Sequence, residues 1–220
     1  MNENNSMESP LFNVMGKLLD VLIMSVLFWV CCIPIFTVGA SISALYTNCL
    51  KMAEDKEGYA FQGFFQAFRS NFKRVTPPWL IMLAIGIGLG IDGYYCIFGT
   101  GFWSYALRWA FLVLLIAYMA VFTYVFPVAS RCIVSTKQLF IMSYVMAFKE
   151  LPWTILMIVI SLALMIFGIF VYQPAFIIAP GVSAFLHSYI FKRIFEKYNL
   201  VAPERDEEQE EEETESGREA

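Results

Sequence analysis

The chain contains few residues that can bind a metal ion or form a cross-link. Clustered His and Cys ligands are needed for a zinc site, and paired cysteines for a disulfide framework. The sequence has one histidine, His187, and an odd number of cysteines without a CxxC pair: Cys31, Cys32, Cys49, Cys96 and Cys132. We therefore expect no metal site, no cofactor and no disulfide framework. We interpret the cysteines as small apolar side chains within a helical bundle.

Reaction motifs are absent from the sequence as well. It contains no HExxH zinc motif, no GxSxG nucleophile motif and no Walker A loop. No pair of carboxylates has helical spacing inside a hydrophobic stretch. We therefore predict that the protein is not an enzyme, and we expect no nucleic-acid partner.

Charge is scarce along most of the chain, whereas apolar residues are abundant. Hydrophobic residues make up 59% of the sequence and charged residues 15%; soluble domains have about 45–50% apolar residues. Each of five apolar stretches is long enough for a helix to cross about 30 Å of hydrocarbon. The stretches are about residues 18–37, 79–98, 109–128, 153–172 and 175–191. The sequence thus predicts an all-α, polytopic membrane protein with five transmembrane helices and the lipid bilayer as its surroundings.

The distribution of positive charge predicts the orientation of these helices. Of the 15 Lys and Arg residues, only Lys17 and Arg108 lie on one side of the predicted membrane, and the other thirteen lie on the opposite side. Cytoplasmic loops carry an excess of Lys and Arg. We therefore predict a short extracellular N-terminus over residues 1–16, a five-helix membrane domain over 17–200 and a cytoplasmic C-terminus.

Residues 203–220 differ in composition from the rest of the chain. They contain ten acidic and two basic residues, and almost no apolar ones. Such a segment cannot bury enough apolar surface to fold by itself. We predict a disordered acidic cytoplasmic tail, which either binds a basic partner or is only solvated.

The two loops on the predicted cytoplasmic side have helical periodicity. In residues 61–74, five phenylalanines fall at i, i+3, i+4, i+7 and i+11, and in residues 140–148 aromatic residues recur every four positions. We expect amphipathic interfacial helices, the first of them ending at Pro77-Pro78. They either dock onto a partner or only lie in the lipid interface. The candidate docking residues are Phe61, Phe64, Phe65, Phe68, Arg69, Phe72, Phe140, Tyr144 and Phe148.

A second candidate site consists of the ionisable residues inside the apolar stretches, where charge is costly. These residues, with one from a flanking loop, are Asp20, Asp92, Arg108 and His187. Together with a predicted break of the fifth span at Pro180-Gly181, they would bind a polar solute or carry protons. The alternative is structural: Asp20 pairs with Lys17, Asp92 contacts Arg108 or interfacial water, and His187 forms a hydrogen bond between helices.

The segment from residue 34 to residue 79 carries a more specific pattern. An apolar span is followed by TxGA, then EGY, then FFxAFRxNF; the matching positions are Thr37, Gly39-Ala40, Ala44-Leu45-Tyr46, Gly58-Tyr59, Phe64-Phe65, Phe68, Asn71-Phe72 and Asp92. On these residues the chain resembles the YesL family of bacterial polytopic membrane proteins, a family of unknown function. The resemblance covers about residues 12–200 and leaves the acidic tail outside.

The resemblance implies a location in the bacterial cell membrane. It also implies a genetic association with carbohydrate ABC importers, glycoside hydrolases and sensor kinases, but it identifies no active residue. We therefore expect a non-enzymatic accessory subunit that takes part in carbohydrate uptake or its sensing, and that docks onto ABC transporter subunits through its cytoplasmic helices. The alternative is a stand-alone transporter or channel for a small solute.

Overall fold

The computed structural model describes residues 10–54, 59–98, 102–170 and 173–198, and over these residues the protein is all-α, as predicted. The predicted tail, residues 203–220, lies outside the described residues. The elements are α1 (Pro10–Cys31), the 3-10 helix η1 (Ile35–Thr37), α2 (Val38–Ala53), α3 (Ala60–Phe98), α4 (Phe102–Arg131), α5 (Thr136–Lys149), α6 (Leu151–Phe170) and α7 (Gln173–Lys197).

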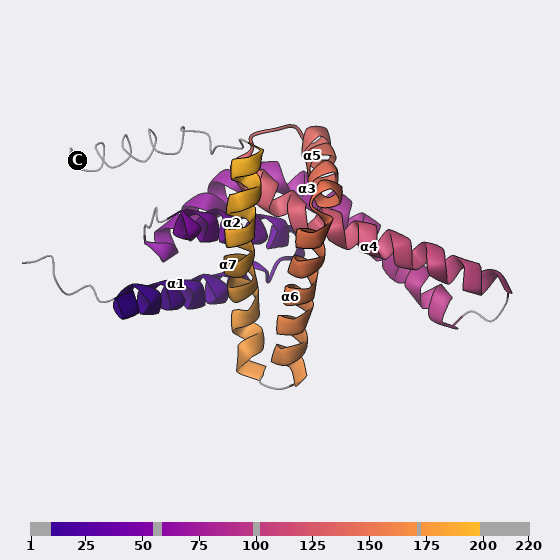
Figure 1. Cartoon of the computed structure of the whole chain (residues 1–220), viewed down its shortest axis with the longest axis horizontal. Helices are drawn as coiled ribbons and strands as arrows, with labels where there is room; N and C mark the ends of the chain where they lie inside the picture. The colour runs from indigo at the N-terminus through magenta and orange to yellow at the C-terminus, as the bar shows by residue number, and fades with distance from the viewer. Residues whose placement is uncertain (1–9, 55–58, 99–101, 171–172, 199–220) are drawn as a thin grey trace, which may run out of the picture.

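The helices spread as three arms from a common packed region (Figure 1). Helix α1 points to the left of the view, the α3–α4 hairpin to the right, and the α6–α7 hairpin downwards. The short helices α2 and α5 lie where the arms meet, on the side away from the end of the α6–α7 hairpin. We call the common region the hub, residues 38–54, 60–79, 120–157 and 184–198.

Four helices of the described residues are long and apolar enough to cross a membrane: Ala60–Cys96, Arg108–Arg131, Leu151–Phe170 and Ala175–Lys197. They correspond to the second, third, fourth and fifth predicted spans. The first predicted span is helical in its major part, as α1, but it is not among these four. The protein is therefore a multi-pass helical membrane protein.

The first apolar stretch is not one helix up to residue 37, as the sequence predicted. Helix α1 ends at Cys31, because the ring of Pro34 disfavours helical backbone at the residue before it. Pro34 itself is extended, with φ −79° and ψ 127°. The Thr37 hydroxyl then donates to the carbonyl oxygens of Cys31 and Pro34 at 2.5 and 2.6 Å, so that it satisfies backbone acceptors at the end of α1. The chain also becomes helical at Pro10, within the predicted N-terminal segment.

The predicted helix break at Pro77-Pro78 is wrong. Helix α3 runs without interruption from Ala60 to Phe98 and joins the interfacial segment to the second span. Proline removes a backbone donor, but its φ of about −65° is compatible with a helix. Packing on both sides of the prolines holds the helix together, since Val75 and Trp79 are buried in the same core cluster.

Helix α2 is the most buried element of the hub. It packs against α1, α3, α4 and α7, and its side chains are mostly small. It packs antiparallel to the first half of α3, and the two helices approach each other closely at both ends of this contact. A Cβ added at Gly39 would lie 2.5 Å from the Trp79 Cβ, and one added at Gly63 would lie 2.5 Å from the Asn48 Oδ1. Glycine is therefore required at position 39 for the helices to approach this closely, whereas a side chain at position 63 would require the Asn48 amide to move.

Candidate functional site

The centre of the hub contains a hydrogen-bonded histidine. His187 on α7 is 1% exposed, and its two ring nitrogens face different helices. The Nδ1 atom lies 3.0 Å from the Tyr46 hydroxyl on α2, and the Nε2 atom lies 3.0 Å from the Met157 carbonyl oxygen on α6. Because a carbonyl only accepts, Nε2 carries a hydrogen. In the neutral ring, Nδ1 then accepts from Tyr46, so His187 joins three helices.

Two titratable side chains of α2 are shielded from water: Cys49 is fully buried, and Tyr46 is partly buried. Burial raises the pKa of the Tyr46 hydroxyl, and it raises the pKa of the Cys49 thiol to about 12. Both groups therefore stay protonated at neutral pH, and Cys49 is a poor nucleophile. Within the described residues, no group of three or more His, Cys, Asp and Glu could hold a metal ion.

The C-terminal end of α2 is bound by two cations from other helices. Lys192 on α7 donates from Nζ to the Ala53 carbonyl oxygen at 3.0 Å, and Arg131 on α4 forms an ion pair with Glu54. A helix C-terminus is the negative end of the helix dipole, so cations are favourable there. These contacts link α2 to the ends of two predicted spans.

Nearby, Arg74 forms one hydrogen bond within α3 and another from α3 to α4. The Arg74 Nη2 donates at 2.6 Å both to the Asn71 side-chain oxygen and to the Ala129 carbonyl oxygen. Some of the positive side chains that predicted the orientation of the helices in the membrane thus also form hydrogen bonds and an ion pair between helices of the hub. Sequence reasoning did not find this use, although the position of these cations beside helix ends was a usable signal.

The predicted docking residues separate into inward and outward positions. Phe64 is fully buried against α2, Phe68 and Phe72 are half-buried, and Phe140 packs against the core. The rings that remain exposed form two pairs, which we call the aromatic pairs: Phe61 with Phe65, 5.1 Å between centroids, and Tyr144 with Phe148, 4.5 Å. Arg69 is exposed on the same helix as the first pair. The two aromatic pairs lie on different helices, α3 and α5.

The predicted polar membrane residues are not brought together. Asp20 belongs to the left arm and Asp92 to the right arm, with the hub between them (Figure 1). Arg108 donates from Nε to the Cys96 carbonyl oxygen at 2.7 Å. Asp92 is exposed and has no ion pair among the residues that the structure describes. His187 is in the hub, bonded as described above.

The predicted break at Pro180-Gly181 is also wrong, because α7 is continuous there. This is where α1 crosses α7. The Trp29 Nε1 donates to the Ile177 carbonyl oxygen at 3.1 Å, and the Ser25 hydroxyl lies 3.4 Å from the Ile178 carbonyl oxygen. Neighbouring side chains commonly satisfy backbone groups near a proline in a membrane helix. The segment is therefore a helix crossing rather than an opening.

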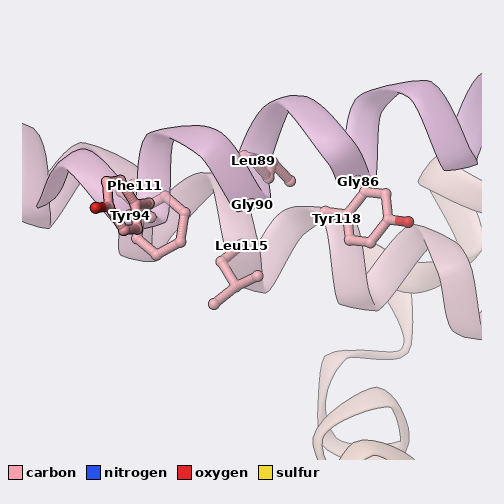
Figure 2. A pocket seen from close by; sticks show the side chains of 8 residues that line it. Gly86, Leu89, Gly90, Tyr94, Phe111, Leu115 and Tyr118 are labelled. Carbon is pink, nitrogen blue, oxygen red and sulfur yellow. The ribbon is translucent and has the colours of Figure 1, made fainter. Parts of the chain in front are cut away.

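An apolar groove of about 420 Å³ lies between α3 and α4 in the right arm (Figure 2). Figure 2 shows Tyr94 and Phe111 at one end of it, Tyr118 at the other, and Leu115 between them. Gly86 and Gly90 leave room on the α3 side, and the Tyr118 hydroxyl donates to the Met82 carbonyl oxygen at 3.1 Å. Among the described residues that line this groove, none is a carboxylate, lysine, arginine or histidine, so this lining suits hydrocarbon rather than a polar solute.

Fold and site together define a multi-pass helical membrane protein whose packed centre is structural. The chain is similar over residues 21–93 to a family described as protein of unknown function, DUF624. The matched part runs from the middle of α1 through α2 to residue 93, five residues before the end of α3, and so contains Tyr46 and both glycines of the α2–α3 pair. No curated protein and no solved structure matches the chain.

Proposed function

We propose that this protein is a non-enzymatic accessory subunit that docks onto a partner membrane complex through its hub. The observation that carries the proposal is the presence of two exposed aromatic pairs on a well-packed region. Phe61 is 57% exposed and Tyr144 is 54% exposed. Burying one such ring in a partner stabilises a complex by about 1.5–3 kcal/mol, and aromatic rings beside arginine are frequent anchors of interfaces.

The proposed topology has five spans, with the N-terminus outside and the C-terminus in the cytoplasm. Helix α1 has 22 residues, enough to extend about 33 Å, so its length suits a fifth span. The cations that pair with Glu54 and bind the end of α2 all belong to the hub. The positive-inside rule then favours a hub on the cytoplasmic side.

The expected partner is a carbohydrate ABC importer, and this part of the proposal rests on the resemblance to the YesL family. In that setting the subunit would contribute to sugar uptake or its sensing in the bacterial cell membrane. A competing interpretation is that the aromatic pairs only anchor the hub in the lipid interface, where aromatic residues are enriched.

The test is affinity purification of the full-length protein from its native membrane in mild detergent, with identification of what is retained. The double variants Phe61→Ser/Phe65→Ser and Tyr144→Ser/Phe148→Ser should lose ABC permease or ATPase subunits. Tyr95→Ser is a matched control, because Tyr95 is 69% exposed but lies in an arm rather than in the hub. Phe64 is not suitable for this test, since its ring belongs to the core.

Retention of the same subunits by both double variants would contradict docking through the aromatic pairs. A native protein that purifies without such subunits would contradict the accessory role. Solute flux in liposomes that contain only this protein would then support the transporter alternative.

A further inference from the structure

A second cavity, of about 150 Å³, lies in the hub where the α5–α6 corner meets the last turns of α7. Its lining combines charged, aromatic and aliphatic side chains: Glu150, Trp153, Ile190, Arg193, Ile194 and Lys197. None of these lining residues belongs to the aromatic pairs or to either candidate site of the sequence analysis.

The charges in this cavity do not cancel. Glu150 is only 7% exposed, and its carboxylate accepts from the Lys197 ammonium and from the Tyr198 hydroxyl at 3.3 Å. Lys197 is therefore matched by Glu150. Arg193, one helical turn earlier, is exposed and has no partner among the described residues. Lys149 adds further positive charge nearby, 5.8 Å from the centre of the Tyr198 ring.

Other lining groups are suited to an amphipathic ligand. Trp153 is 37% exposed, and within the described part of the chain its indole N–H has no hydrogen-bond partner. Ile190 and Ile194 supply an apolar wall, and the exposed Leu186 continues it along α7 towards the arm. A cation and an N–H donor thus lie beside an apolar strip that leads into the predicted bilayer.

We propose that this cavity binds the phosphate of an anionic phospholipid, with Arg193 and the Trp153 indole donating to its oxygens. A guanidinium binds phosphate through paired hydrogen bonds, and basic pockets at the cytoplasmic ends of membrane helices bind anionic head groups. Glu150 holds Lys197 in place beside the phosphate. The acyl chains lie along Ile190 and Leu186. The inference rests on the proposed cytoplasmic position of the hub and does not depend on a protein partner.

The experiment is native mass spectrometry of the purified full-length protein, titrated with phosphatidylglycerol and with phosphatidylcholine of the same acyl chains. Phosphatidylglycerol should bind more tightly. Arg193→Gln should weaken its binding about fivefold, since one cation near a membrane surface contributes about 1 kcal/mol. Trp153→Phe keeps the ring but removes the N–H, and it should weaken binding by a smaller factor.

Lys137→Gln is the control, because it removes one exposed cation at the other end of α5, about 18 Å away by helical rise. It should leave binding unchanged. Equal binding of the two lipids would overturn the proposal, and so would equal losses in the Arg193 and Lys137 variants, which would indicate diffuse charge. Displacement of the lipid by excess inorganic phosphate would show a free-phosphate site instead. None of these results depends on whether an importer is retained in the purification above.

Discussion

At the scale of single residues, small side chains set how closely the helices approach. Gly181 on α7 faces α1, and a Cβ there would lie 2.0 Å from the Ser25 hydroxyl oxygen and 2.8 Å from the Val21 carbonyl oxygen. Gly90 on α3 has no heavy atom within 4 Å of such a Cβ. Two glycines in apolar helices thus have opposite structural roles, which their local sequences do not reveal.

We predict that Gly181→Ala destabilises the protein by about 1–3 kcal/mol, because the added methyl group forces α1 away from α7. Gly90→Ala should not destabilise it, since alanine favours the helix and the space is open. Thermal unfolding in one detergent, followed by circular dichroism, gives the comparison. Equal transition temperatures for the two variants would mean that the α1–α7 crossing is looser than described.

The hydrogen bond between Tyr46 and His187 should stabilise the hub measurably. In a double-mutant cycle of Tyr46→Phe and His187→Ala, we expect a coupling energy of about 0.5–1.5 kcal/mol, the range found for hydrogen bonds between membrane helices. The measurement is the free energy of unfolding in mixed micelles. Strictly additive effects would show that the two side chains do not interact.

At the scale of helices, the end of α2 depends on charges that come from other elements. The side chains of Arg131 and Glu54 are 10% and 25% exposed, so their ion pair is largely shielded from water. We predict that Arg131→Met destabilises the protein by about 1–3 kcal/mol, because Glu54 loses its partner. Adding Glu54→Gln should restore part of that loss.

The control for this prediction is Lys137→Met, which removes an exposed cation from α5 and should change the transition temperature little. The measurement is thermal unfolding of the three variants beside the native protein. If Arg131→Met and Lys137→Met behave alike, the ion pair contributes nothing to the stability of the hub.

The helices themselves were predictable from sequence to different degrees. Four long apolar helices matched their predicted spans, because apolar length is a direct signal of a membrane helix. The continuity of α3 through Pro77-Pro78 and of α7 through Pro180 was not predictable. A proline destabilises the helix around it, and this effect is visible in the sequence. Whether the helix nevertheless continues depends on packing against residues far away in the sequence.

The candidate sites were predicted less well for the same reason. The periodicity of the phenylalanines located a helix face but not what covers it, and α2 covers Phe64. A hydrogen bond from His187 to another helix was one of the two interpretations from sequence. Its partners Tyr46 and Met157 could not be predicted, because they lie 141 and 30 residues away. Burial of Glu150 and its bond to Lys197 were missed, because neither residue belongs to a recognisable motif.

At the scale of the whole molecule, the positive charge gathered in the hub makes a prediction about sidedness. In a cysteine-free background, a cysteine at Thr100, between α3 and α4, should react with a membrane-impermeant maleimide in intact cells. A cysteine at Lys137, at the start of α5, should react only after the membrane is permeabilised. The reverse pattern would invert the proposed topology.

The contacts of α7 have a consequence for biosynthesis. Tyr46, Trp29 and the end of α2 all bond to residues of α7, the last described helix to leave the ribosome. Until α7 is inserted, these groups of α1 and α2 lack the partners that they have in the folded protein. We therefore expect the N-terminal half to reach its final packing only when the C-terminal helix is in place, and we expect a chain that stops before residue 173 to be less stable and more readily degraded than the full-length protein.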